Sequence, residues 1–107
     1  MTLLKVTINN WENIISSEYS MIVIEKNDCS ECEKWTKSLL ELKFPKNLII
    51  AKLNLNDPGL GRIKIDNPWI STIDILPFNT FFVNGKMTEN WSGARLGPMD
   101  RRFNFSH

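Results

Sequence analysis

The chain has 107 residues, 42% hydrophobic and 23% charged, which is typical of one globular domain covering residues 1–107. No segment approaches the roughly 20 apolar residues that cross a bilayer, and the net charge of +1 comes without a basic run, so a membrane or nucleic-acid partner is not expected. The first residues lack a basic start followed by an apolar segment, and we therefore expect a cytoplasmic protein that acts as a monomer.

The first half of the sequence predicts alternating strands and helices. Apolar and polar residues alternate in the predicted edge strand, whereas the second strand is a continuous apolar run that is typical of a central position. Asn9-Asn10 offers an N-cap for the first helix, and Phe44-Pro45 ends the second. In chain order we predict a strand at 4–8, a helix at 11–17, a strand at 21–25, a helix at 30–42 and a strand at 47–55. A parallel strand–helix–strand unit with a right-handed crossover results.

The second half contains a hairpin after a segment of uncertain type. Residues 61–75 fit neither helical nor strand spacing, and we expect a short irregular helix and a connection there. Two runs of strand-forming residues on either side of Asn84-Gly85 predict a β-hairpin over residues 79–91. The tail at 98–105 predicts a brief closing helix with proline in its first turn.

The two cysteines of the chain lie at the junction of the second strand and second helix, in Cys29-Ser30-Glu31-Cys32. A helix N-terminus presents unpaired backbone N–H groups and a positive dipole end, and both favour a thiolate over a thiol. This placement suggests reversible dithiol/disulfide exchange, in which Cys29 attacks a substrate disulfide and the more shielded Cys32 resolves the mixed disulfide.

Two other interpretations of the cysteine pair remain open. A two-residue separation closes too small a loop to stabilise a fold much, which disfavours a structural disulfide without excluding one. Zinc takes four ligands, and His107 is the only other soft ligand, so a metal or cluster site would need carboxylates of the same chain or paired cysteines from two chains. We expect no bound cofactor or metal.

The order of strands and helices, with CxxC after the second strand, resembles the thioredoxin family over nearly the whole chain. Ile75-Leu76-Pro77 leading into a strand, followed by the Asn84-Gly85 turn, is similar to the family's proline segment and penultimate hairpin. The resemblance implies an α/β thioredoxin-like fold, with a central mixed sheet of four to five strands flanked by helices.

The same resemblance implies a substrate-binding groove beside the cysteines. Pro77 would be cis, and the backbone of Leu76 would pair with an incoming chain; a trans proline that merely starts a strand is the alternative. Trp91-Ser92-Gly93-Ala94 is similar to the family's Gly-Ala loop that lines the groove, although Gly93 could also simply end a strand.

The chain departs from the thioredoxin pattern around the cysteines, which leaves the subfamily undecided. Asp28 stands where tryptophan is usual, and Ser30-Glu31 replaces Gly-Pro. Val23 stands where thioredoxins bury an aspartate; Glu25, on the same strand face, either replaces that carboxylate or is a solvated strand end. Acidic neighbours oppose the ionisation of Cys29, and we therefore expect a reductant rather than a strong oxidant.

The leading function predicted from the sequence is a small thiol-disulfide oxidoreductase that reduces protein disulfides, with electrons from an external reductase or glutathione. The alternative is a non-catalytic binding module that holds a partner chain in the groove formed by Leu76, Pro77 and Gly93. A metal or cluster carrier is the third hypothesis.

Overall fold

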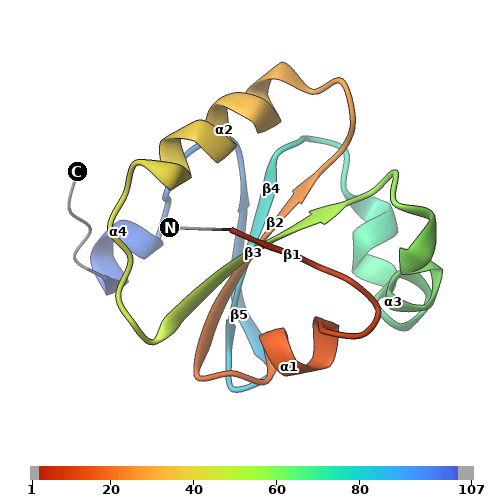
Figure 1. Ribbon diagram of the computed structural model, residues 1–107, viewed down its shortest axis with the longest axis horizontal. Coiled ribbons are helices and arrows are strands. Elements are labelled where there is room, and N and C mark those ends of the chain that lie inside the picture. Colours follow the sequence, from red (N-terminus) through yellow and green to blue (C-terminus); the bar gives the residue numbers. More distant parts are fainter. Residues whose placement is uncertain (1–2, 104–107) are drawn as a thin grey trace.

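A five-stranded mixed sheet forms the centre of the computed structural model, which describes residues 3–103 (Figure 1). The strands are β1 Leu4–Lys5, β2 Tyr19–Glu25, β3 Leu48–Asn54, β4 Phe78–Val83 and β5 Lys86–Ser92. They lie in the order β1-β3-β2-β4-β5, in which β1, β3 and β2 are parallel and β4 and β5 are antiparallel to their neighbours. The expected mixed sheet is confirmed.

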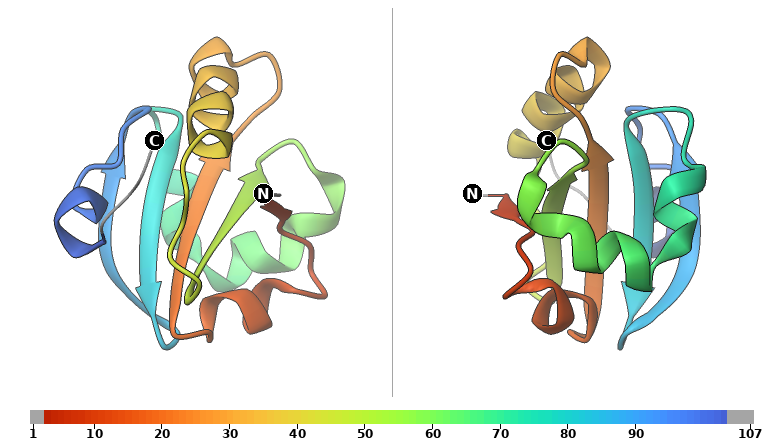
Figure 2. Two further views of the ribbon diagram at one scale, coloured as in Figure 1. Left: turned by 60° about the vertical axis from the view of Figure 1, so that its left-hand side comes forward. Right: turned by 90° about the vertical axis from the view of Figure 1, so that its right-hand side faces the viewer.

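Helices cover both faces of this sheet (Figures 1 and 2). They are α1 Trp11–Ile15, α2 Ser30–Leu40, α3 Gly61–Asp66 and α4 Met99–Arg102, with 3-10 turns η1 Pro58–Leu60 and η2 Pro68–Thr72. α2 and α4 pack on one face, and α1 and α3 with its flanking turns pack on the other. None of the helices within residues 3–103 has the length and apolar character needed to cross a bilayer.

The central strand β2 is apolar throughout because each of its faces is buried. Successive side chains of a strand point to opposite faces, so Val23 packs with Trp35 of α2 while Ile22 packs with Trp11 of α1. The same period of two places Glu25 on the α2 face, at the end of the strand. The fold therefore directs one carboxylate of β2 toward the helix that carries the cysteines.

The first predicted strand is too long, because the chain turns away from the sheet at Thr7. The side-chain oxygen of Asn10 accepts from the backbone N–H of Thr7 at 2.7 Å, and Thr7 Oγ1 accepts from the N–H of Asn10 at 3.2 Å. These bonds form the turn that starts α1, so that β1 ends at Lys5. At its other end α1 stops at Ile15 rather than at residue 17, and Ser17 Oγ donates to the carbonyl oxygen of Ile14 at 2.6 Å. Asn10 is the N-cap residue, but its side chain bonds Thr7 and caps no helical N–H.

The remaining elements follow the sequence pattern with small corrections. α2 ends at Leu40 rather than at residue 42; Leu40 is 46% exposed, whereas Leu42 is buried just beyond the helix. The hairpin turns at Asn84 and Gly85, whose φ values of 49° and 90° suit a type I′ turn. Residues 58–72 form short turns and a helix, as expected of an irregular segment. The predicted closing helix is α4, and the prediction for residues 104 and 105 lies outside the described residues.

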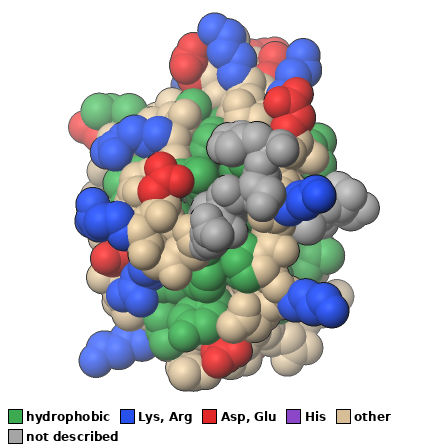
Figure 3. All heavy atoms as spheres, turned by 90° about the vertical axis from the view of Figure 1, so that its left-hand side faces the viewer, with side chains coloured by type: hydrophobic (Ala, Val, Ile, Leu, Met, Phe, Trp, Pro, Cys, Tyr) green, Lys and Arg blue, Asp and Glu red, His purple; other side chains and the backbone are tan. Residues whose placement is uncertain are grey.

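Figure 3 views the molecule from the left-hand side of Figure 1, where α4 lies. Lys and Arg side chains are interspersed with acidic ones on this face, and they do not gather into one patch. A concentrated basic footprint of the kind that binds phosphate backbones is not visible on this face.

Candidate functional site

The cysteines lie where the sequence placed them, between β2 and the first turn of α2. Cys29 and Cys32 form a disulfide, with their Cα atoms 5.3 Å apart. Cys29 is half-buried, whereas Cys32 is 2% exposed. The pair therefore presents one accessible sulfur and one shielded sulfur.

Cys29 is the N-cap residue of α2, and its sulfur accepts a hydrogen bond from the backbone N–H of Cys32 at 3.2 Å. The first N–H groups of a helix have no intrahelical partner, so the sulfur occupies the position that a capping oxygen usually takes. A negative charge on this sulfur after reduction would gain from the same N–H and from the positive end of the helix dipole.

Acidic side chains near the cysteines oppose this effect only in part. Glu31 and Glu33 lie in the first turn of α2, where they add negative charge. Both side chains are exposed, and Lys34 Nζ lies 3.2 Å from the carboxylate of Glu31. Water, salt and this lysine screen the acids, whereas the Cys32 N–H contacts the Cys29 sulfur directly.

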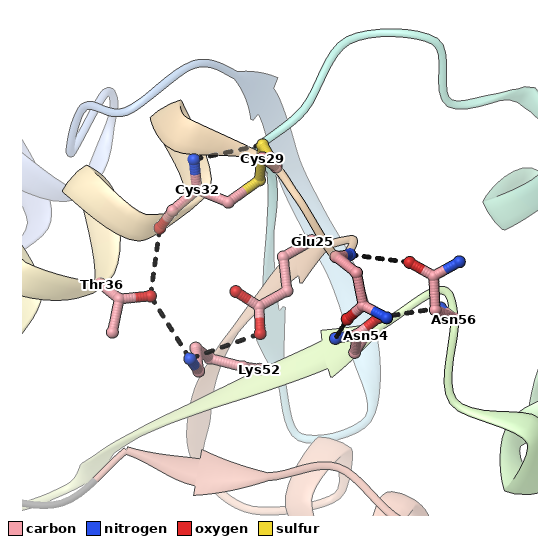
Figure 4. The surroundings of a disulfide bond; sticks show 8 residues. Glu25, Cys29, Cys32, Thr36, Lys52, Asn54 and Asn56 are labelled. Atoms are coloured by element: carbon pink, nitrogen blue, oxygen red, sulfur yellow. Dashed lines mark hydrogen bonds and ion pairs between the residues drawn. A yellow bond between two sulfur atoms is a disulfide. The ribbon is translucent and has the colours of Figure 1, made fainter.

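An asparagine network holds the loop that leads into Cys29 (Figure 4). Asn54 Nδ2 donates to Asn27 Oδ1 at 3.0 Å, and the backbone N–H of Asn27 donates to Asn56 Oδ1 at 2.7 Å. Asp28 follows with φ of 55°, a left-handed conformation that aspartate tolerates better than most side chains. The bonds tie the β2–α2 loop to the end of β3 and fix the direction from which Cys29 enters the helix.

A polar chain lies beneath the cysteines on the α2 face of the sheet (Figure 4). Lys52 Nζ lies 3.3 Å from the carboxylate of Glu25 and donates to Thr36 Oγ1 at 3.4 Å, and Thr36 Oγ1 donates to the carbonyl oxygen of Cys32 at 3.1 Å. The interpretation of Glu25 as a solvated strand end is wrong, because its side chain is only 14% exposed and is paired with Lys52. The α2 helix covers this end of β2 and excludes most of the water from it.

The proline segment reaches the same edge of the sheet as the cysteines. Ile24 near the end of β2 pairs with Phe78 at the start of β4, so Pro77 lies next to the strand end from which the cysteine loop departs. The Leu76–Pro77 peptide bond is cis, as the resemblance implied, and the trans alternative is wrong. The backbone N–H of Gly93 donates to the carbonyl oxygen of Pro77 at 2.8 Å. This bond joins the predicted Gly-Ala loop to the same edge of the sheet.

Gly93 directly follows the end of β5 and has φ of +103°, a conformation that L side chains rarely adopt. Gly93 therefore follows the strand end and contacts the proline segment, and its place in a substrate groove stays a prediction.

An apolar pocket of about 230 Å³ adjoins the proline segment. It is lined by Trp69 and Ile73 of the η2 region, by Ile75, and by Phe78 and Met87 of the hairpin, among others. Leu76 packs against the same group of side chains. Trp69 thus lies beside the segment predicted to bind substrate.

Sequence reasoning missed Asn79, which is fully buried in β4 and hydrogen-bonded to Trp35. Trp35 is itself 3% exposed and belongs to the core between α2 and the sheet. One signal in the sequence was available. Asn79 stands two residues before Phe81 and therefore on the same face of the strand, and an amide on a buried face needs hydrogen-bond partners there.

Within residues 3–103, no group of three or more His, Cys, Asp or Glu side chains could hold a metal ion. His107 lies outside the described residues, and a site shared between two chains would use only the two cysteines of each.

No protein-family model matches the sequence, and neither does any curated protein. Solved structures match it in fold. Thioredoxin f2 from Chlamydomonas reinhardtii is 13% identical, with a TM-score of 0.72 over 96% of this chain and 94% of that chain. The oxidised thioredoxin from Plasmodium falciparum is 14% identical, with a TM-score of 0.71 over 94% of each chain. The thioredoxin Mala s 13 from Malassezia sympodialis is 13% identical, with a TM-score of 0.70 over 94% of this chain and 87% of that chain. Identities this low establish a likeness of fold alone.

Proposed function

Because this chain has the thioredoxin fold and carries a CxxC pair at the N-terminus of α2, we propose that it is a thiol-disulfide oxidoreductase that reduces protein disulfides. The observation that carries the proposal is the asymmetry of the pair. Cys29 is accessible and receives an N–H from its own helix, and Cys32 is shielded. A purely structural disulfide needs neither feature.

The reaction begins with the dithiol form of the protein. The thiolate of Cys29 attacks one sulfur of the substrate disulfide, the substrate S–S bond breaks, and a mixed disulfide forms while the released substrate sulfur takes up a proton. Cys32 then loses its proton and attacks the sulfur of Cys29, which releases the second substrate sulfur as a thiol. Two electrons pass to the substrate, and the Cys29–Cys32 disulfide remains. An external reductase or glutathione returns it to the dithiol.

Glu25 is the proposed acceptor of the Cys32 proton. Its carboxylate lies on the α2 face at the end of β2, beneath the pair in Figure 4, and Lys52 balances its charge. Thr36 links this lysine to the backbone of Cys32. A carboxylate with little exposed surface can exchange a proton with a shielded thiol where bulk water cannot reach.

The substrate chain is proposed to bind across the edge formed by Leu76, Pro77 and Gly93. The cis bond turns the Leu76 backbone at the start of β4, and an extended substrate segment can pair with backbone there as an added strand does. The apolar pocket beside Leu76 can take a hydrophobic side chain that flanks the substrate cysteine.

The test is reduction of insulin with dithiothreitol as the electron source. The wild-type protein should accelerate it, and Cys29→Ser should abolish the effect. Incubated with insulin after dithiothreitol has been removed, reduced Cys32→Ser should accumulate a mixed disulfide that is visible by mass. Activity retained in both single variants would show that the roles are wrongly assigned. An inactive wild-type protein that still binds an unfolded chain would favour the non-catalytic binding module instead.

A redox titration of the pair against glutathione and dithiothreitol complements this assay. A midpoint in the range of cytosolic reductants, about −270 mV, supports a reductant, whereas one near the roughly −120 mV of strong oxidants would contradict it. We propose that the protein works in the cytoplasm as a monomer. Gel filtration of the reduced and oxidised forms tests the monomeric state.

A further inference from the structure

A buried asparagine connects separate parts of the proposed site. Asn79 is the second residue of β4, and its side chain has no exposed surface. Its Oδ1 accepts a hydrogen bond from Trp35 Nε1 at 2.8 Å. Its Nδ2 donates to the carbonyl oxygen of Trp91 at 3.2 Å and to that of Gly93 at 2.9 Å. Asn79 therefore bridges helix α2, strand β5 and the loop that begins at Gly93.

The chemistry of these partners fixes the orientation of the amide. The indole N–H of Trp35 can only donate, and the two carbonyl oxygens can only accept, so the oxygen of Asn79 faces α2 and its nitrogen faces the loop. Burying an amide costs free energy unless its groups are paired. Leucine would leave the indole N–H of Trp35 without its acceptor and would remove one donor from each carbonyl oxygen, although that of Gly93 still accepts from the backbone N–H of Arg95 at 3.0 Å. Aspartate would keep the acceptor for Trp35 and remove both donors. The network thus requires an amide at this position.

Both ends of the network reach residues of the proposed site. Trp35 lies three residues after Cys32 on α2, a spacing that puts the two side chains on one side of the helix. Gly93 donates its backbone N–H to the carbonyl oxygen of Pro77 at 2.8 Å. Asn79 therefore links the cysteine helix to the loop that bonds the proline segment.

We propose that Asn79 is a positioning residue whose two bonds to the carbonyl oxygens of Trp91 and Gly93 hold the Gly93 loop where a substrate chain fits beside Pro77. This inference rests on the proposed function, because it assumes that substrate binds along this edge. Asn79 acts on chains that span the groove, whereas a small disulfide needs only access to the sulfur of Cys29. Its effect therefore appears in KM for protein substrates and leaves the intrinsic reactivity of the thiol unchanged.

Two variants separate the two arms of the network. Asn79→Leu keeps a side chain of similar size and removes both arms, whereas Trp35→Phe removes only the arm to α2. With insulin, Asn79→Leu should raise KM by about fivefold to tenfold, because losing hydrogen bonds lowers the fraction of loops in the binding position. Trp35→Phe should change KM by less than about twofold. Both reduced variants should react with 5,5′-dithiobis(2-nitrobenzoic acid) at the wild-type rate.

An Asn79→Leu variant with the wild-type KM would overturn the positioning role. A wild-type protein that does not reduce insulin instead overturns the proposed function, and the role of Asn79 is then decided by amide hydrogen exchange. The backbone N–H groups of Gly93 and Arg95 should exchange about tenfold faster in Asn79→Leu than in Trp35→Phe, and equal rates would refute the role. If Asn79→Leu does not fold, Asn79→Asp replaces it, because aspartate keeps an acceptor for Trp35 and lacks donors for the loop.

Discussion

Within residues 3–103, two Lys–Glu ion pairs have nearly equal N–O distances and differ in burial. Comparing them tests how strongly burial affects the contribution of an ion pair to stability. Lys52 Nζ lies 3.3 Å from Glu25, and Lys34 Nζ lies 3.2 Å from Glu31. The side chains of the first pair are 28% and 14% exposed, and those of the second are 70% and 59% exposed. Substituting methionine for each lysine removes the charge and keeps most of the apolar stem.

The expected cost follows from the burial of each pair. At an effective dielectric constant of about 20, unit charges separated as in the Lys52–Glu25 pair attract by roughly 5 kcal/mol, and the lost hydration of both groups offsets much of this. Loss of one partner costs about 3–5 kcal/mol in a fully buried pair and about 0–1 kcal/mol in an exposed one. Lys52→Met should therefore lower the free energy of unfolding by about 2 kcal/mol, and Lys34→Met by less than about 0.5 kcal/mol.

Urea unfolding of the oxidised proteins, followed by tryptophan fluorescence, measures both losses. In thermal unfolding, Lys52→Met should lower Tm by roughly 8–10 °C for a chain of this size. The double variant Glu25→Gln/Lys52→Met completes a mutant cycle and should recover part of the loss, because no charge then remains unpaired. Equal losses in Lys52→Met and Lys34→Met would refute the reasoning that burial decides the strength of these pairs.

Two other predictions concern positions outside the cysteine pair. A hydrogen bond from the backbone N–H of Gly59 is the main cause that holds the pKa of Asp57 below its ordinary 3.8, so Asp57 stabilises the fold above that pH and the effect is lost as pH falls through the lowered pKa. Asp57→Asn should therefore narrow the difference in urea stability between neutral and acidic pH, and an unchanged difference would contradict this. An added Cβ at Gly97, where φ is +55°, would lie 2.8 Å from Trp91 Nε1, so Gly97→Ala should cost about 1–2 kcal/mol. Gly61→Ala in α3, where an added Cβ meets nothing within 4 Å, should be neutral or stabilise the fold by up to about 1 kcal/mol. Thermal unfolding measures both glycine variants, and an equal loss of stability in the two would contradict this prediction.

The sequence predicted those features that depend on residues close together in the chain. The apolar run in β2, the Asn84-Gly85 turn and the position of Cys29 at a helix start each follow from local pattern. The cis bond at Pro77 followed from the family resemblance, because local preference alone favours trans.

Features that depend on distant partners could not be predicted in this way. Asn79 meets Trp35 across 44 residues, and no spacing rule connects a strand asparagine to a particular indole. The burial of Glu25 depends on α2 folding over the end of β2 and on Lys52 from a neighbouring strand. The left-handed conformation of Asp28 likewise depends on the asparagine network that holds its loop.

The burial of Glu25 also explains how a thioredoxin fold can lack an aspartate at Val23 and still hold a carboxylate under its cysteines. Side chains of a strand alternate between faces, so a move of one residue would place the carboxylate among the apolar side chains on the α1 face. A move of two residues keeps it on the α2 face and shifts it roughly 6.6 Å toward the end of the strand. Glutamate is one methylene longer than aspartate and can reach back, and Lys52, which pairs in register with Val23, lies within 3.3 Å of the relocated carboxylate. Lys52 and Glu25 thus place an ion pair on the α2 face of the sheet, beneath Cys32.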